Sequence, residues 1–312
     1  MILHNNIKKE IIFAVPGSKT FISDYYKNKK DSFINISITG TSCELNCPHC
    51  RTYLLKDMYS VTSSQILESF IADKIKSGKL NGVLISGGFD KNGKLPIKNY
   101  LNSIKMIKIR YPSLKIYAHT GFVDYDEARK ISEAGMDGIL ANVISSQHAI
   151  NCIYNLTDAT PEDYYRTLIN LKKAQNKIAP HIIIGLDYGK IESEYDAVKR
   201  ISEIGADCLV FVVLKKLTAG INLVNLKNHF REVKNINEKD ILSLITFTRK
   251  LLPDIPITFG CAKPLTKNKG QLEIDLINAG IDIMAFPSKE AVDYVISNKI
   301  PFKFEESCCA NI

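Results

Sequence analysis

The 312-residue sequence lacks the features of a membrane or secreted protein. No apolar run reaches the length of a bilayer-spanning helix, and residues 1–30 carry no basic-then-apolar signal pattern. The 8 cysteines are too few for a disulfide-stabilised scaffold of this length. We therefore expect a soluble, cytoplasmic protein that has no association with a membrane.

The sequence also lacks low-complexity segments, a Gly/Ser-rich linker and an aromatic RNA-binding motif. Its composition, 45% hydrophobic and 24% charged, is ordinary for a globular protein of one large domain or two. The net charge of +8 comes from lysines scattered along the chain. This pattern is typical of a solvated basic surface, and it also suits an acidic partner. A nucleic acid is the less favoured partner because no motif for one is present.

Short apolar runs alternate with amphipathic stretches eight times from residue 32 onward. The expected strands span residues 33–38, 82–86, 114–119, 138–143, 181–185, 208–214, 257–259 and 281–286. The expected helices span residues 63–76, 97–110, 125–134, 161–174, 193–204, 238–252, 269–279 and 289–297. Strict alternation predicts an α/β fold with a parallel sheet, and eight units predict a (β/α)8 TIM-type barrel, complete or nearly complete. An open barrel of six units with an appended domain is the alternative.

The barrel prediction divides the chain into three parts. Residues 1–31 form an N-terminal extension, residues 32–298 the barrel, and residues 299–312 a C-terminal tail over the barrel mouth. In such barrels the chemistry takes place at the carboxyl ends of the strands and in the loops that follow them. Polar residues directly after the expected strands should therefore belong to one site.

Three cysteines, Cys43, Cys47 and Cys50, lie on the loop after the first expected strand, spaced C-x3-C-x2-C. Three thiolates on one short loop can hold three corners of a 4Fe–4S cube and leave the fourth iron without a protein ligand. S-adenosyl-L-methionine can bind such an open iron through its amino and carboxylate groups. A structural zinc site is the alternative, with His49 or a distant cysteine as the fourth ligand.

Two neighbouring loops add candidates to the same face. Gly87 and Gly88 follow the second expected strand, and paired glycines let the backbone approach a ligand closely. His119 ends the third expected strand and is a candidate catalytic residue. A structural histidine is the alternative for this position.

The next strands contribute further polar residues. Asn142 ends the fourth strand and is a candidate for binding ribose hydroxyls, because an amide both donates and accepts hydrogen bonds. Asp187 and Lys190 follow the fifth strand and are candidates for facing the substrate or the cofactor carboxylate, with a structural ion pair as the alternative. Lys215 and Lys216 follow the sixth strand and would attract anions or be solvated.

A second group of cysteines suggests a second metal site. Cys261 follows the seventh expected strand, and Cys308 and Cys309 lie near the end of the chain. Adjacent cysteines seldom bond each other, so the tail pair and Cys261 are candidate ligands with three sulfurs. A frayed terminus with idle thiols is the alternative. Cys152 is one candidate for the fourth ligand, whereas Cys208, at the start of the sixth strand, is expected in the core.

Taken together, these motifs resemble the radical SAM superfamily in its biotin-synthase-like branch, and more specifically the subunits of two-component lipoyl synthases of archaea and bacteria. His49 fills the place of the aromatic or imidazole residue that the superfamily has before its third cysteine. The motifs are I-T-G-x-x-C-x-L-N-C-x-H-C at 38–50, S-G-G at 86–88, H-T-G at 119–121, G-L-x-Y-G-K at 185–190, G-C-x-K-P at 260–264 and A-F-P-S at 285–288. The chain departs from the family pattern at Phe89, Asp187 and Lys263, where an acidic residue, a histidine and often an arginine are expected.

The resemblance implies a sulfur-inserting enzyme. A reduced 4Fe–4S cluster on Cys43, Cys47 and Cys50 would cleave S-adenosyl-L-methionine to methionine and a 5′-deoxyadenosyl radical. The radical would abstract hydrogen from an octanoyl chain, and the carbon radical would attack a sulfide of an auxiliary 4Fe–4S cluster that is consumed as sulfur donor. The family role of Gly87 and Gly88 is to meet the amino group of the bound methionine moiety.

The resemblance also implies the partners. The octanoyl chain would arrive on a lipoyl carrier domain or a glycine-cleavage H protein, a second radical SAM subunit would act with this one, and a donor such as ferredoxin would supply electrons. Three alternatives stay open. They are a radical SAM enzyme of biotin-synthase-like or mutase type on a small molecule, a tRNA-modifying enzyme, and a zinc-bound scaffold without activity.

Overall fold

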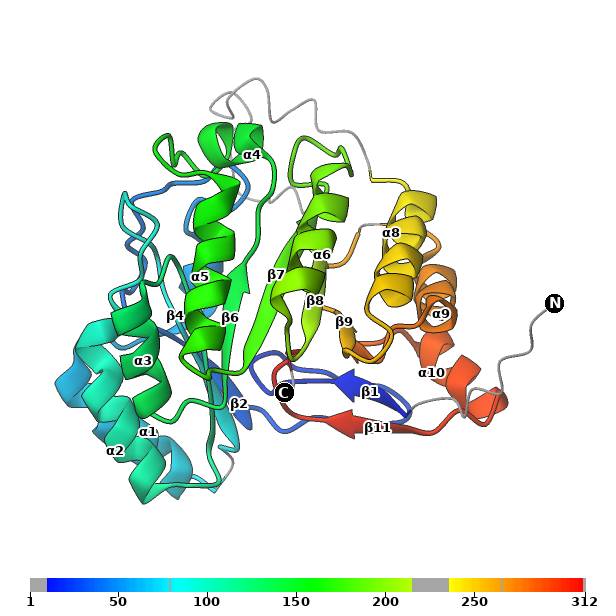
Figure 1. The fold of residues 1–312 in the computed structure, drawn as a ribbon. Helices are drawn as coiled ribbons and strands as arrows, with labels where there is room; N and C mark the ends of the chain where they lie inside the picture. Colours follow the sequence, from blue (N-terminus) through cyan, green and yellow to red (C-terminus); the bar gives the residue numbers. More distant parts are fainter. Residues whose placement is uncertain (1–9, 79, 215–235, 265, 311–312) are drawn as a thin grey trace, which may run out of the picture.

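The fold is an eleven-stranded, curled parallel sheet with helices packed on its outer face (Figure 1). The computed structural model describes residues 10–78, 80–214, 236–264 and 266–310. In that part of the chain the strand order is β11-β1-β10-β9-β8-β7-β6-β5-β4-β2-β3. Every pairing between neighbouring strands is parallel. All carboxyl ends therefore point the same way, as the site prediction requires.

All eight expected strands are present. They are β2 (Phe33–Ser37), β4 (Gly82–Ser86), β5 (Lys115–Thr120), β6 (Gly138–Asn142), β7 (Ile178–Ile184), β8 (Leu209–Val213), β9 (Ile257–Phe259) and β10 (Ile283–Ala285). Short apolar runs became strands here because both faces of the sheet are covered, so neither face needs polar residues.

All eight expected helical stretches are helical too. They are α1 (Ser64–Lys76), η2 (Ile97–Tyr100) with α2 (Leu101–Arg110), α3 (Tyr125–Glu133), α5 (Pro161–Lys173), α6 (Ser193–Ile204), α8 (Glu238–Leu251), α9 (Lys269–Ala279) and α10 (Lys289–Ser297). Local signals set several ends: Asp124 accepts a hydrogen bond from Glu127 N at the start of α3, and Gly280 takes a left-handed conformation after α9. Two short helices, η1 (Tyr53–Asp57) and α4 (Gln147–Cys152), lie in loops after strands and were not predicted.

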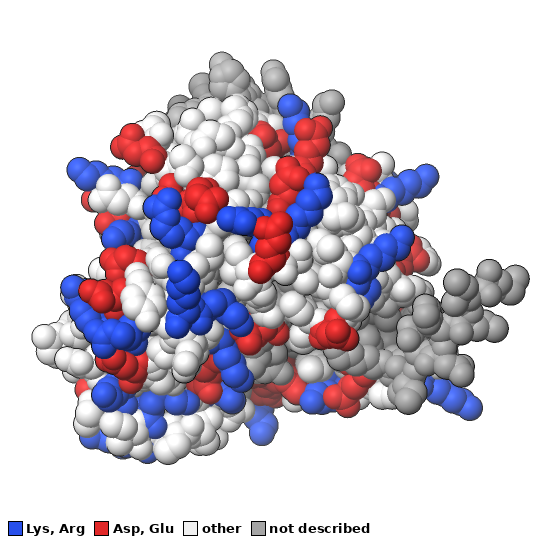
Figure 2. Space-filling model, viewed as in Figure 1, with Lys and Arg blue, Asp and Glu red and all other residues white. Residues whose placement is uncertain are grey.

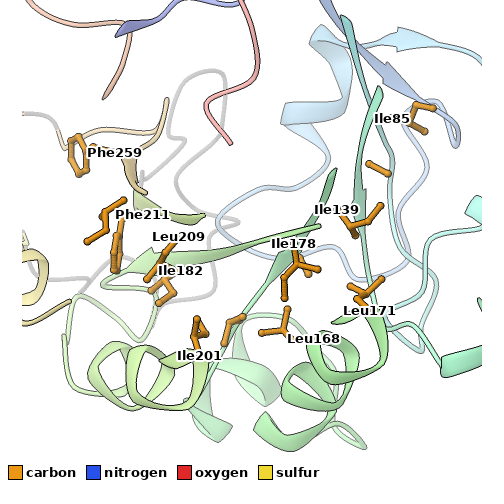
Figure 3. Packing of buried hydrophobic residues seen from close by; sticks show 14 of the residues in the cluster. Ile85, Ile139, Leu168, Leu171, Ile178, Ile182, Ile201, Leu209, Phe211 and Phe259 are labelled. Atoms are coloured by element: carbon orange, nitrogen blue, oxygen red, sulfur yellow. The ribbon is translucent and has the colours of Figure 1, made fainter. Parts of the chain in front are cut away.

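Alternate residues of each strand face opposite layers of the core. Outward-facing Ile139, Ile178, Ile182 and Phe211 pack in one cluster with helix residues such as Leu168 (Figure 3). The inward-facing residues form a second cluster, which contains Phe33, Tyr117, Leu140, Ala179, Cys208 and Val210. The period of two along each strand therefore separates a helix-covered face from a concave inner face.

The two ends of the chain meet at one edge of the sheet, which the sequence did not predict. Strand β1 (Ile11–Ala14) pairs with β10 on one side and with β11 (Phe302–Glu305) on the other (Figure 1). The opposite edge is β3 (Tyr59–Ser60), which pairs with β2. The first and eighth predicted strands therefore do not pair with each other in the described residues, so closure of a complete (β/α)8 barrel is not confirmed. The sheet also extends beyond residues 32–298, because β1 comes from the N-terminal extension and β11 from the tail.

The tail lies inside the curve of the sheet rather than over its mouth. Cys308 and Ala310 are buried in the inner cluster with Phe33 and Tyr117. The end of the tail therefore lies in the inner layer, beside the first residue of β2. Strand β11 thus leads the tail to the concave side of the sheet, where Cys308 and Ala310 are buried.

Charges on the surface are mixed. Lys and Arg side chains alternate with Asp and Glu side chains over the face seen in Figure 2, as scattered lysines predict. No helix among the described residues is long and apolar enough to cross a bilayer. Lys215 and Lys216 lie outside the described residues.

Candidate active site at the cysteine loop

The cysteine loop follows β2, and Cys47, the middle cysteine, lies at its centre. Cys47 is buried, whereas Cys43 and Cys50 are partly exposed, and all three are free thiols. The backbone N–H groups of Cys50 and Arg51 both donate to Cys47 O, at 3.0 and 2.8 Å. Burial raises the pKa of the Cys47 thiol well above its usual range and also raises the pKa of Cys50. Thiols of this kind lose their protons when a metal or cluster binds them.

The loop holds three residues in the left-handed region of backbone space. They are Asn46 with φ 43°, Arg51 with φ 45° and Thr52 with φ 58°. This conformation is strained for a β-branched residue such as Thr52. Strain of this kind is common at functional sites, where the surrounding structure maintains it.

The predicted Gly87-Gly88 pair lies against the cysteine loop. Gly88 N donates to Thr39 Oγ1 at 2.6 Å, and Phe89 N donates to Cys43 Sγ at 3.4 Å. A Cβ at Gly88 would lie within 3.0 Å of Ser42 O and Cys43 Cβ, a spacing that real Cβ atoms do not show. Gly88 is therefore needed for the two loops to touch, which is a structural reason for glycine beside any role toward a cofactor.

Asp90, one residue later than the family's acidic position, stabilises its own loop. Its Oδ1 accepts hydrogen bonds from Asn92 N at 2.9 Å and Lys94 N at 2.8 Å. This is an Asx-type turn, and these hydrogen bonds alone explain why an aspartate stands at this position.

His49 faces a tyrosine that the sequence did not single out. The ring of His49 lies 5.4 Å from the ring of Tyr154, and its buried Nδ1 has no hydrogen-bond partner in the protein. Burial lowers the pKa of His49 to about 4 and raises the pKa of Tyr154 well above 10. Asn155 Nδ2 donates to Leu45 O at 2.6 Å, so the segment after α4 is tied to the cysteine loop.

Two of the predicted residues meet on the inner face of the sheet. Asn142 lies beside His119, whose pKa burial lowers to about 4, and Asn142 Nδ2 donates to the hydroxyl of Tyr154 at 3.3 Å. His181 lies edge-on to His119 with ring centroids 5.6 Å apart, and its pKa falls to about 3, first by burial. Both imidazoles are therefore neutral at pH 7. His181 was missed as a site residue, although a histidine inside an apolar strand was a signal.

Asp187 and Lys190 do not lie with this group. Asp187 Oδ2 accepts a hydrogen bond from Ser146 Oγ and its Oδ1 contacts His148 Nδ1, both at 2.7 Å. These contacts hold the start of α4. Lys190 is exposed on a tight turn in which its N–H donates to Asp187 O at 2.9 Å. The contacts of Asp187 and Lys190 are those of a structural turn, the alternative that the sequence left open, and their roles toward substrate and cofactor stay predictions.

A buried carboxylate below this turn was also missed. Glu194 is 3% exposed, and its Oε1 accepts from Gly185 N at 2.7 Å. Burial raises its pKa to about 7. Glu194 lies in the first turn of α6, where acidic residues are common, so the sequence carries no local signal that it is buried.

The second group of thiols is assembled from distant parts of the chain. Cys309 hydrogen-bonds with Cys308 and with the backbone of Cys261, and its pKa is raised well above 9. Cys208, predicted as a core residue, is buried and packs in the inner cluster with Cys308 and Cys309. Cys152 is an exposed residue at the end of α4.

Lys263, the residue that departs from the family's arginine, anchors the loop of Cys261. Its Nζ donates to Glu273 Oε1 at 2.7 Å and to Phe286 O at 3.1 Å, and both charged side chains are almost fully buried. Ser288 N donates to the other oxygen of Glu273 at 2.6 Å. The pair thus ties the loop after β9 to the loop after β10.

No three Cys, His, Asp or Glu side chains within the described residues gather around a point that one metal ion could occupy. A 4Fe–4S cube binds each cysteine through a different iron, so its ligands do not have to meet at one point. Three free thiols on one loop fit such a cube by their chemistry.

A cleft of about 720 Å³ opens beside the cysteine loop. Cys43, Gly88 and Phe89 lie at one side of it, and the start of α3 lies at the other. Its lining includes five carboxylate side chains and three lysines. The cysteine loop is thus reachable from solvent on this side.

Comparisons with known proteins agree with this geometry. The family model of the radical SAM superfamily matches residues 37–214. No curated protein matches the chain by sequence. Among solved structures, the [FeFe]-hydrogenase maturase HydG superposes with a TM-score of 0.61 at 12% identity, over 97% of this chain and 66% of that one.

Two further solved structures are similar. Methylornithine synthase (PylB) has a TM-score of 0.57 at 17% identity, with 86% of this chain and 72% of that one covered. SuiB of Streptococcus suis, bound to S-adenosylmethionine, has a TM-score of 0.54 at 13% identity, with 77% and 52% covered. At sequence identities this low, the structural similarity shows a shared fold. The chain spans less than two thirds of the length of HydG and about half that of SuiB.

Proposed function

The chain belongs to the radical SAM superfamily, and from that premise we propose that it inserts sulfur into an octanoyl chain carried by a lipoyl carrier protein. Membership implies an enzyme that uses S-adenosyl-L-methionine and a 4Fe–4S cluster. Cys43, Cys47 and Cys50 are the residues that would hold this cluster. When bound, it supplies the electron that turns S-adenosyl-L-methionine into a hydrogen-abstracting radical.

The observation that carries the sulfur-insertion proposal is the second group of thiols. Its support is that Cys309 hydrogen-bonds with Cys308 and with the backbone of Cys261, although about fifty residues separate Cys261 from the tail pair in sequence. A radical SAM enzyme needs only the first three cysteines for its radical. We assign Cys261, Cys308 and Cys309 to an auxiliary 4Fe–4S cluster that would supply the sulfur.

The residues of the inner face have roles in this proposal. The neutral imidazoles of His119 and His181 offer no charge to an apolar octanoyl chain, and His119 can position the chain beside the cofactor. Asn142 can exchange its hydrogen bond to Tyr154 for one to the cofactor ribose. Both imidazoles are buried in the curled sheet, and a shielded cavity of this kind suits radical chemistry.

The partners of this reaction are part of the proposal. They are an octanoylated lipoyl carrier domain or H protein, a second radical SAM subunit, and an electron donor such as ferredoxin. A chain with a net charge of +8 would attract acidic carriers.

A single-cluster radical SAM enzyme acting on a small molecule is the second candidate. Its support is that Cys308 and Ala310 are packed in the inner core cluster, where a thiol also serves as a small apolar residue. The two proposals differ in the number of clusters.

Anaerobic iron and sulfide analysis with EPR separates them. We expect about eight irons in the wild type and about four in either alanine triple variant, at Cys43, Cys47 and Cys50 or at Cys261, Cys308 and Cys309. Cys152→Ala, which removes an exposed thiol outside both groups, is the matched control and should keep about eight. About four irons in both the wild type and the Cys261 triple variant would exclude the auxiliary cluster. Mass spectrometry of an octanoylated carrier after turnover then tests for the gain of one sulfur atom.

A further inference from the structure

The short helix α4 and the residues after it lie against the cysteine loop. Ile150 and Ile153 are fully buried, and they belong to one apolar cluster with Cys47. A helix of only six residues is not stable by itself in water. The contacts at its two ends therefore set its position, and we call residues 146–156 the α4 segment.

Asp187 fixes the start of the α4 segment. Its Oδ2 accepts a hydrogen bond from Ser146 Oγ and its Oδ1 contacts His148 Nδ1, both at 2.7 Å. Ser146 Oγ accepts in turn from Ala149 N at 3.1 Å, as the N-cap of the helix. One carboxylate on the turn after β7 thus holds both the cap and the first turn of α4.

Asn155 fixes the other end of the α4 segment to the cysteine loop. Its Nδ2 donates to Leu45 O at 2.6 Å, and Leu45 lies between Cys43 and Cys47 in the sequence. The backbone of Asn155 is left-handed with φ 56°, a conformation that asparagine tolerates better than most residues. The amide of Asn155 therefore binds the part of the loop that carries two of the three thiols.

The α4 segment also contacts two candidate cofactor-binding residues. The ring of Tyr154 lies 5.4 Å from that of His49, and its hydroxyl accepts a hydrogen bond from Asn142 at 3.3 Å. A shift of the segment would move the cysteine loop, His49 and Asn142 relative to one another. Groups behind metal ligands commonly orient those ligands, and their loss weakens metal binding.

We propose that Asp187 and Asn155 are positioning residues that hold the cysteine loop in its cluster-binding shape through the α4 segment. The inference rests on the proposed function in one respect, because it needs a 4Fe–4S cluster on Cys43, Cys47 and Cys50. It does not need the auxiliary cluster. Asp187 acts on the first cluster indirectly, from the far end of the segment, and Asn155 acts on the loop itself.

The variants remove one anchor each and spare the backbone. Asn155→Gly keeps the left-handed conformation without strain, so only the amide is lost. Gln175→Gly, at an exposed left-handed residue after α5, is the matched control. Asp187→Ala removes both acceptor oxygens, whereas Asp187→Asn keeps one acceptor and gains a donor for the same two partners.

Two readouts that do not depend on turnover follow the cysteine loop. The first is alkylation of Cys47 in the reduced, metal-free protein, measured by peptide mass spectrometry with fully buried Cys208 as the internal reference. The second is the EPR spectrum of the dithionite-reduced cluster in the loaded protein. Urea unfolding of every variant checks that it folds.

We expect Cys47 to react about fivefold faster in Asn155→Gly and about tenfold faster in Asp187→Ala, because each lost hydrogen bond makes local opening of the loop easier. The EPR spectrum should change in both variants. In Gln175→Gly and Asp187→Asn, both readouts should resemble those of the wild type.

Wild-type alkylation and EPR spectra in Asn155→Gly and Asp187→Ala would overturn the inference, and so would equal changes in Gln175→Gly. Faster alkylation with an unchanged EPR spectrum would also overturn it, because the two residues would then stabilise the loop without positioning the cluster. Asp187→Asn behaving like Asp187→Ala would remove Asp187 from the assignment, since its charge and not its hydrogen bonds would matter. A wild type without a reducible cluster would instead overturn the proposed function, and the inference with it.

Discussion

The two groups of thiols differ in how the chain builds them. Cys43, Cys47 and Cys50 lie on one loop, and a family model covers that part of the chain. Cys261 and the tail pair lie far apart in sequence, and strand pairing at the β1–β11 edge brings the tail to the inner face. A local site is specified by a short motif. An assembled site depends on every contact that positions its parts.

The largest expected effect tests the local site. Gly88→Ala should lower the rate of 5′-deoxyadenosine release by at least about 100-fold, because the new methyl group would push the loop that carries Cys43. Iron content at the first site should fall with it. In Gly87→Ala the nearest atoms are side-chain atoms of Thr39 and Leu95, at 2.8 and 3.0 Å. Those atoms can shift, so we expect a smaller loss, and equal rates for the two variants would contradict the close approach at Gly88.

The difference between the two groups also explains what the sequence could predict. The eight strands and eight helices follow from local periodicity, and the structure has all of them. The position of β1 does not follow, because the run Ile11–Ala14 is apolar in any location and only pairing with β10 and β11 places it in the sheet. The pairing of β11 with β1 is also absent from the local pattern, so the tail was expected over the mouth and not in the sheet.

The candidate site divides in the same way. The cysteine loop and the two glycines could be read from spacing. Contacts across the sheet, such as His119 with His181 and Asp187 with His148, depend on register and on an unpredicted short helix. Buried Glu194 has no local sequence signal at all.

A stability measurement tests whether the buried ion pair of Lys263 and Glu273 anchors the loop of Cys261, which belongs to the assembled site. Lys263→Met leaves Glu273 buried without its cation, and the free energy of unfolding in urea should fall by about 3–5 kcal/mol. Replacing both partners, Lys263→Met with Glu273→Leu, should restore most of the loss. Lys199→Met, which breaks an exposed pair with Asp196, is the matched control with an expected cost below about 1 kcal/mol. Equal losses at Lys263 and Lys199 would show that the buried pair does not anchor the loop of Cys261.

The smallest expected effect concerns the contact between the two ends of the chain. Tyr26 donates to Glu306 Oε1 at 2.9 Å, and its ring stacks on Phe304 at 4.7 Å. Tyr26→Phe keeps the stacking and removes one hydrogen bond, so local opening of the tail should cost about 1 kcal/mol less and occur about fivefold more often. Alkylation of Cys308 in the metal-free protein measures this opening, with exposed Cys152 as the internal reference.

Tyr25→Phe is the matched control for this last change, because the Tyr25 hydroxyl bonds Asp293 on α10 and not the tail. A faster reaction of Cys308 in Tyr26→Phe alone would show that the N-terminal extension holds the tail thiols in place. If both variants react like the wild type, the strand pairing of β1 with β11 is sufficient, and the assembled site depends on the sheet rather than on the side chains around it.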